Sequence, residues 1–132
     1  IEDPFGAAIE WVLDVAHNPD AARELAKALA TLPPRARVIG VVGILADKNA
    51  DEIVGELTAV IDAWVLCALD GARGRTAEQL RAELSPPVSV IGMTPSVAEA
   101  CVLARAIAGS NDRIVVLGSF HVVGPALDWL GV

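Results

Sequence analysis

Short apolar runs alternate with amphipathic segments along the whole chain. Five runs are rich in branched aliphatic residues and have the length of strands: 9–16, 38–45, 63–69, 88–91 and 114–117. Five segments have helical spacing: 21–31, 50–60, 76–84, 96–108 and 121–130. Strands that alternate with helices favour a parallel sheet, because each crossover helix returns the chain to the same end of the sheet. The pattern predicts an α/β fold, a Rossmann-like three-layer domain with a mostly parallel sheet flanked by helices.

Local signals mark the ends of several of these elements. Asn18 is placed to cap the first helix, and Thr76 with Gln79 has the spacing of a capping box. Pro86-Pro87 is expected to end the third helix, because proline cannot continue a helical hydrogen-bond ladder. Gly124-Pro125 is a candidate interruption of the last helix for the same reason.

Composition narrows the class of protein. Apolar residues make up 54% of the 132 residues and charged residues 20%, which excludes a disordered chain and fits one domain, residues 1–132. The mean hydropathy is +0.52, yet no apolar run approaches the ~20 residues that span a bilayer. The net charge of −7 excludes a general attraction to nucleic acid or to an anionic membrane surface.

The two cysteines and the chain start suggest a cellular context. Cys67 and Cys101 both lie in apolar segments, where buried free thiols are expected. Free thiols fit a reducing compartment, so we expect a cytoplasmic protein. The sequence begins at Ile1 without a methionine or a signal peptide, and we expect it to be a piece of a longer polypeptide.

Polar turns follow four of the predicted strands. They lie at 14–19, 47–48, 70–75 and 118–121, and hold most of the side chains that can do chemistry. Ligands of parallel sheets bind beyond the carboxyl ends of the strands. We therefore expect these four turns to lie on one edge of the sheet.

The first turn holds the most informative residues. Asp14 falls within an apolar strand, where an unpaired carboxylate is costly, so it needs a ribose hydroxyl, a cation or a backbone N–H as a partner. Asp14 and Asn18 have a second interpretation, in which they only shape the turn. His17 is placed to meet a carboxylate ligand, although a loop histidine is also compatible with simple solvation.

The other turns carry weaker signals. Ser119 lacks the Gly-x-Ser-x-Gly context of a nucleophile, so it is a candidate helix cap or a donor to an oxyanion, and His121 is expected to be structural. Arg73 and Arg75 are candidates to clamp an anion or to stay solvated, and Asp47-Lys48 is a candidate loop ion pair. The sequence has no phosphate-binding glycine motif and no Cys/His set with metal-ligand spacing.

Four segments, taken together, resemble a known family. They are Leu-Asp-Val-Ala-His-Asn-Pro at 13–19, Gly-Ile-Leu-Ala-Asp-Lys at 43–48, Arg-Gly-Arg-Thr-Ala-Glu-Gln-Leu at 73–80 and Gly-Ser-Phe-His at 118–121. In order and spacing they resemble the C-terminal domain of bacterial bifunctional dihydrofolate synthase/folylpolyglutamate synthase, within the Mur ligase superfamily. The resemblance covers nearly the whole chain. The first segment is shared with other Mur-type ligases, whereas the last two narrow the resemblance to the folate branch.

The resemblance implies an ATP-dependent amide ligase. In that family ATP phosphorylates the carboxylate of dihydropteroate or of a folate's terminal glutamate, and the amine of L-glutamate attacks the acyl phosphate. The phosphate loop and the Mg²⁺ ligands belong to an N-terminal ATPase domain of the same polypeptide. This implies that the chain alone is inactive and binds neither ATP nor Mg²⁺ tightly. A monomer with no nucleic-acid or membrane partner is expected.

The resemblance also implies roles for individual residues. Asp14 would contact the nucleotide, while His17 and Ser119 would hold the incoming glutamate, with His17 as the catalytic residue. Lys48, Arg73 and Arg75 are left as anion or loop contacts. Family members carry a nucleotide-contacting arginine just upstream of the first strand, and residues 1–6 hold none.

Two alternatives stay open. One is another Mur-type ligase that joins amino acids to cell-wall precursors. The other is a non-catalytic nucleotide-sensing or receiver module, which also places an aspartate at a strand end. A receiver needs an adjacent acidic pair for Mg²⁺, and the first turn offers only Asp14.

Overall fold

The computed structural model describes residues 1–85 and 88–132. Strands and helices alternate from end to end, as predicted. The elements are β1 (Glu10–Asp14), α1 (Pro19–Thr31), β2 (Val38–Val42), α2 (Ala50–Gly55), β3 (Ala63–Cys67), α3 (Ala77–Glu83), β4 (Val90–Thr94), α4 (Val97–Ile107), β5 (Arg113–Leu117) and α5 (Phe120–Leu130).

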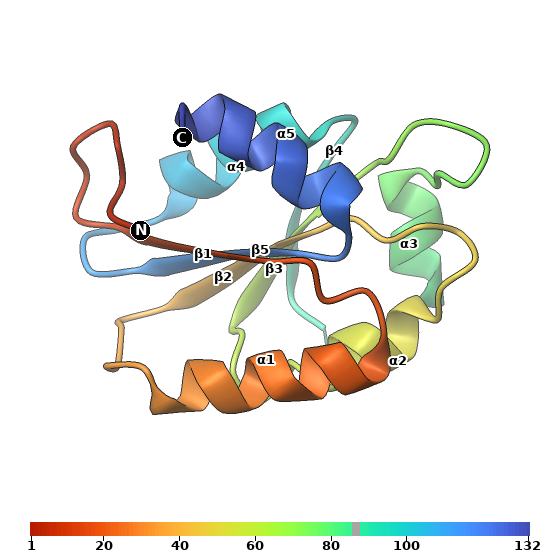
Figure 1. Cartoon of the computed structure of the whole chain (residues 1–132), viewed down its shortest axis with the longest axis horizontal. Coiled ribbons are helices and arrows are strands. Elements are labelled where there is room, and N and C mark those ends of the chain that lie inside the picture. The colour runs from red at the N-terminus through yellow and green to blue at the C-terminus, as the bar shows by residue number, and fades with distance from the viewer. Residues whose placement is uncertain (86–87) are drawn as a thin grey trace.

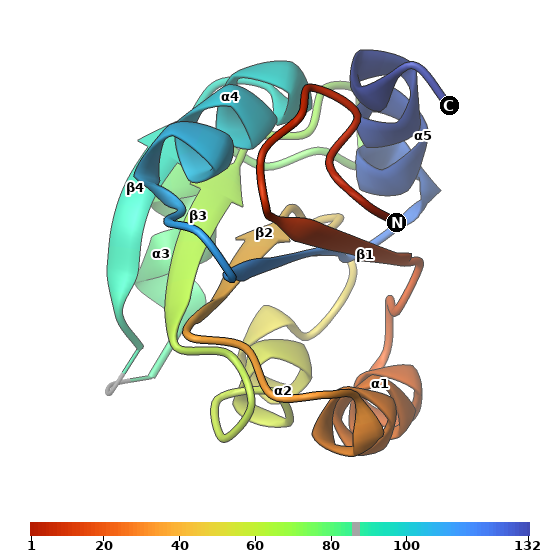
Figure 2. The ribbon, with the colours of Figure 1, turned by 90° about the vertical axis from the view of Figure 1, so that its left-hand side faces the viewer.

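The five strands form one sheet in the order β1-β5-β2-β3-β4, and every neighbouring pair is parallel. Helices α1, α2 and α3 cover one face of the sheet, and α4 and α5 cover the other (Figures 1 and 2). All residues of β3 and β5 are buried, because helices exclude water from both faces. The predicted three-layer α/β fold is confirmed.

The last strand, β5, is inserted between β1 and β2. The crossover through α4 returns the chain over the face opposite to α1 and α2, and α5 then continues on that face (Figure 2). Beyond the carboxyl end of β5 the chain therefore enters a helix on one face of the sheet. Beyond β1 and β2 it enters helices on the opposite face. Such a switch point opens a crevice where ligands of α/β sheets bind.

Local signals for helix starts are confirmed. The Asn18 side chain accepts a hydrogen bond of 2.8 Å from the Ala21 N–H and caps α1. Thr76 and Gln79 form both bonds of a capping box at the start of α3. α3 ends at Glu83 with Leu84 as its C-cap, and the expected effect of Pro86-Pro87 lies outside the described residues.

Several boundaries differ from the prediction. The first three strands end two or three residues earlier than predicted, at Asp14, Val42 and Cys67. α2 ends at Gly55, because glycine disfavours helix and the following residues form tighter turns, with Leu57 N–H bonded to Val54 O. β4 begins at Val90 and extends to Thr94, because it pairs with β3 over that range. α5 is not interrupted at Gly124-Pro125. The N–H that Pro125 lacks would have bonded to the His121 carbonyl, and Pro125 is exposed, so water can satisfy that carbonyl.

Cys67 and Cys101 are both buried and free, as predicted. Burial raises the pKa of each thiol to about 12, so both stay protonated at neutral pH. In the described part of the chain no helix has both the length and the apolar character needed to cross a membrane.

Candidate active site

The predicted polar turns converge at the carboxyl edge of the sheet. A pocket of about 260 Å³ lies there, and side chains from the turns after β1, β2, β3 and β5 line it. We call it the strand-end pocket, and its lining residues are His17, Leu45, Lys48, Arg73, Ser119, Phe120 and His121. The prediction that these turns share one edge is confirmed. Asp14 and Arg75 are not among the side chains that line the pocket.

A close backbone contact brings two walls of this pocket together. Gly118 follows β5 with a φ of +124°, a conformation that residues with side chains rarely adopt. A Cβ atom at Gly118 would lie 2.0 Å from the carbonyl oxygen of Gly43, in the turn after β2. Only glycine allows the turn that carries Ser119 to approach the β2–α2 loop this closely.

The turn after β1 is held by its own side chains. Asp14 Oδ1 accepts a hydrogen bond of 2.9 Å from the Ala16 N–H, so the structure gives this carboxylate a backbone partner. The His17 side chain is exposed, and its Nδ1 lies 3.0 Å from the Val15 carbonyl oxygen. A carbonyl only accepts hydrogen bonds, so Nδ1 carries the proton, and Nε2 of the neutral ring keeps a lone pair. His17 therefore offers a base toward solvent.

Ser119 forms the opposite side of the pocket. It is buried, with 6% of its surface exposed, and it caps α5 by accepting a hydrogen bond of 2.9 Å from the His121 N–H. An accepting oxygen leaves the hydroxyl hydrogen to be donated to a ligand. The first N–H groups of α5 add the positive end of a helix dipole. The helix-cap interpretation of Ser119 is confirmed, and the cap does not consume its donor.

Cations gather around the pocket although the whole chain is acidic. The loop ion pair predicted between Asp47 and Lys48 is wrong, because Asp47 pairs with Arg73 at 2.6 Å. The hydrogen bond from Arg73 lowers the pKa of Asp47. Lys48 is half-buried and forms no ion pair within residues 1–85 and 88–132, so its charge is available to an anion.

Arg75 behaves differently from Arg73. Only 5% of its surface is exposed, which excludes the solvated interpretation. Its guanidinium donates to the carbonyl oxygens of Leu45 and Lys48 at 2.7 and 3.0 Å, and it pairs with Glu83. Arg75 is thus a loop contact and does not clamp an anion in this pocket.

Two pocket residues escaped the sequence reasoning. Leu45 supplies an apolar wall, and Phe120 stands at the rim with 75% of its surface exposed. Both residues lie just after strands, which is a usable signal, but they are apolar, whereas all the predicted site residues are polar. Within residues 1–85 and 88–132, no group of three or more His, Cys, Asp or Glu is arranged to hold a metal.

The family model of the Mur ligase glutamate ligase domain matches residues 3–120. The chain belongs to this family. The resemblance drawn from the four segments is confirmed.

Two similar proteins carry the same functional name. The chain is 40% identical over 117 residues to the dihydrofolate synthase/folylpolyglutamate synthase of Escherichia coli (strain K12), covering 89% of this chain and 27% of that protein. The Haemophilus influenzae protein of the same name is 36% identical over 131 residues, which cover 93% of this chain and 30% of that protein. The chain thus spans less than a third of either relative.

Solved structures agree with this assignment. The bifunctional folylpolyglutamate synthase/dihydrofolate synthase of Yersinia pestis c092, complexed with AMPPNP and Mn, superposes with a TM-score of 0.83 at 34% identity. It covers all of this chain, which spans 32% of that structure. A further structure of an enzyme with this name holds Mn, AMPPNP and L-glutamate, with a TM-score of 0.82 at 34% identity over 96% of this chain and 30% of that structure.

Proposed function

We propose that this chain is the glutamate-ligase domain of an ATP-dependent amide ligase that adds L-glutamate to dihydropteroate, to a folate's glutamate tail, or to both. The observation that carries the proposal is the convergence of His17, Lys48 and Ser119 on one pocket of about 260 Å³. A base, a cation and a hydroxyl donor suit an amino acid that has two carboxylates and a nucleophilic amine. The names and ligands of the relatives support the same substrate class.

The reaction has two balanced steps. A carboxylate oxygen of the pteroate or folate first attacks the γ-phosphorus of ATP, giving an acyl phosphate and ADP. The amine nitrogen of L-glutamate then attacks the acyl carbon, an amide bond forms, and inorganic phosphate leaves with the electron pair of the broken C–O bond. The amine must lose a proton in this step. His17 Nε2 is the acceptor, since Nδ1 is already committed to the Val15 carbonyl.

The remaining groups hold L-glutamate in place for that attack. Lys48 attracts one of its carboxylates, and the Ser119 hydroxyl with the start of α5 donates to an anionic oxygen. Fixing the amine against the acyl carbon converts a bimolecular encounter into a positioned reaction. Asp14 contacts the nucleotide through Oδ2, because Oδ1 accepts the Ala16 N–H.

The rest of the ligase is assigned to other parts of the same polypeptide. We infer that residues 1–132 form one C-terminal domain and that an N-terminal ATPase domain supplies the phosphate loop and the Mg²⁺ ligands. The chain covers only 27–32% of the relatives' length, which supports this division. The chain alone is then inactive and does not retain ATP or Mg²⁺. We expect the complete enzyme to be a cytoplasmic monomer, and sedimentation of the purified protein tests the monomeric state.

A ligation assay tests the proposal. The complete polypeptide and residues 1–132 are each incubated with ATP, Mg²⁺, L-glutamate and either dihydropteroate or a reduced folate. The masses of the products are then measured by mass spectrometry. Addition of glutamate by the complete polypeptide alone is the expected result. If neither protein extends a pteridine, the folate assignment fails. Extension of a cell-wall precursor would assign the chain to another Mur-type ligase, and phosphoryl transfer from a small phosphodonor to Asp14 would indicate a receiver.

A further inference from the structure

The buried guanidinium of Arg75 links three segments of the chain. One nitrogen, Nη2, donates to both the Leu45 and the Lys48 carbonyl oxygens, at 2.7 and 3.0 Å. The other, Nη1, pairs with Glu83 on α3. The two carbonyls belong to the β2–α2 loop, whose side chains Leu45 and Lys48 line the strand-end pocket. Arg75 thus holds the backbone of residues whose side chains form a pocket wall.

The β2–α2 loop has few other attachments to the β3–α3 loop. The Ala46 N–H donates to the Arg73 carbonyl at 2.7 Å, and the exposed Arg73 side chain pairs with Asp47. Exposed ion pairs contribute little to stability, whereas loss of Arg75 removes a charge-assisted hydrogen bond from each of the two carbonyls and leaves the Leu45 carbonyl with the Lys48 N–H at 3.1 Å. Arg75 is therefore the attachment whose removal changes the loop most.

We propose that Arg75 is a positioning residue of the strand-end pocket, which fixes the β2–α2 loop so that Lys48 faces a carboxylate of L-glutamate. This inference rests on the proposed function. Arg75 touches no substrate, and it acts by holding the Leu45 and Lys48 carbonyls. Nη2 serves the two carbonyls and Nη1 serves Glu83, a planar fork of donors that the compact ammonium of lysine does not reproduce.

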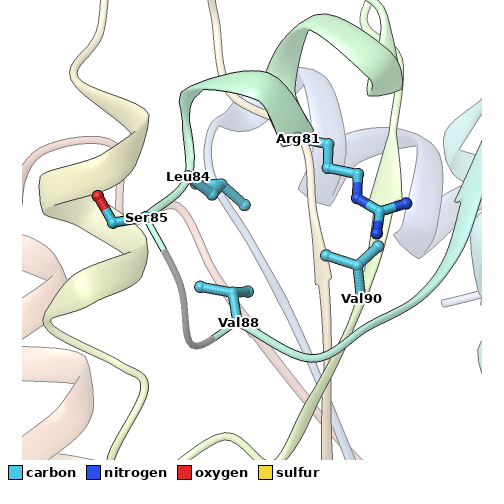
Figure 3. Close-up of a pocket in the computed structure, with 5 residues that line it drawn as sticks. All are labelled: Arg81, Leu84, Ser85, Val88 and Val90. Carbon is cyan, nitrogen blue, oxygen red and sulfur yellow. The ribbon is translucent and has the colours of Figure 1, made fainter.

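The design uses one test variant and two matched controls in the complete polypeptide. R75K keeps the positive charge but replaces the two guanidinium nitrogens that donate hydrogen bonds with a single ammonium. R81K makes the same change at an exposed arginine of α3, which lines a separate pocket beside Leu84 and Val90 (Figure 3). E83Q removes the negative charge of the Arg75 partner without touching the two carbonyls, and Glu83 is half exposed.

Two measurements are made on each variant. Steady-state ligation separates KM for L-glutamate from kcat, and hydrogen–deuterium exchange follows the amides of Ala46 and Lys48. For R75K we expect KM for L-glutamate to rise at least about fivefold with kcat within about twofold of wild type. Exchange at these two amides should accelerate at least about tenfold, while the amide of Val122 in α5 stays unchanged. R81K and E83Q should match wild type.

Each other result overturns the inference. A wild-type KM in R75K refutes it, and so does faster exchange throughout the protein without a change in KM, which indicates a general structural role. An E83Q effect as large as that of R75K shows that the ion pair, not the carbonyl bonds, matters. Failure of the wild-type polypeptide to add glutamate refutes the proposed function and this inference together, whereas an active wild type with an unaffected R75K refutes the inference alone.

Discussion

Asp3 is the most strongly tied carboxylate near the start of the chain, and its replacement tests the packing of the α4–α5 face. The Arg105 guanidinium donates to both of its oxygens at 3.0 Å. The indole N–H of Trp11 donates to Oδ1, also at 3.0 Å, and the Ala7 N–H donates to Oδ2 at 2.9 Å. The Asp3 side chain has no exposed surface. The change D3N weakens all of these charge-assisted bonds.

The pKa of Asp3 gives the size of the stability loss expected for D3N. Burial raises this pKa, but the hydrogen bonds from Arg105, Ala7 and Trp11 outweigh burial and lower it from 3.8 to about 2. Each pKa unit corresponds to about 1.4 kcal/mol, so the ionised carboxylate contributes about 2 kcal/mol to the free energy of unfolding at neutral pH. D3N should remove about this amount.

The pH dependence of this contribution to stability follows from the direction in which the pKa of Asp3 is shifted. The folded protein binds the Asp3 proton more weakly than the unfolded chain does, because the folded pKa is the lower one. The contribution is therefore complete well above pH 3.8 and is lost as the pH falls through about 2. Near pH 3 about half of it should remain.

Urea unfolding of wild type and D3N at pH 7 and pH 3, followed by tryptophan fluorescence, measures the loss of stability and its pH dependence. E2Q is the matched control, since it removes the same charge from the exposed neighbour Glu2 and should change stability by less than about 0.5 kcal/mol. A difference between wild type and D3N that stays constant from pH 7 to pH 3 would show that the charge of Asp3 is not what stabilises the fold.

Three further predictions concern the site. H17A in the complete polypeptide should lower the rate of glutamate ligation at least about tenfold, about 1.4 kcal/mol, and unchanged turnover would exclude His17 from the reaction. D14A should raise KM for ATP several-fold, whereas a loss of thermal stability alone would leave Asp14 as a turn residue. G118A should lower the free energy of unfolding by at least about 2 kcal/mol, because its Cβ would lie 2.0 Å from the Gly43 oxygen at a φ of +124°; a melting temperature equal to that of wild type would contradict the close approach.

Much of the fold was predictable because its signals are local. Asn18 caps a helix through a contact three residues away, and Thr76 with Gln79 does the same. The apolar runs become strands because a segment covered by helices on both faces must be apolar throughout. The boundaries that failed, at Gly55 and Pro125, depend on solvent exposure and on how the next turn packs, which a periodicity does not contain.

The candidate site was predictable only as a set of turns. Strand ends of a parallel sheet share one edge, so the sequence could indicate that His17, Lys48 and Ser119 would meet. It could not indicate that Asp47 would pair with Arg73, 26 residues away, or that Arg75 would be buried while Arg73 is not. These outcomes depend on how two loops pack against each other.

The sequence by itself determined the class of fold, the helix caps and the chemistry available at the strand ends, because these follow from interactions between near neighbours and from the exclusion of water by apolar runs. Only the tertiary structure decided that β5 lies between β1 and β2, that Asp3 meets Arg105 across 102 residues, and that Gly118 touches Gly43. The physical reason is that side chains far apart in the sequence interact only after the sheet has brought their backbones together, and it is this packing that forms the strand-end pocket.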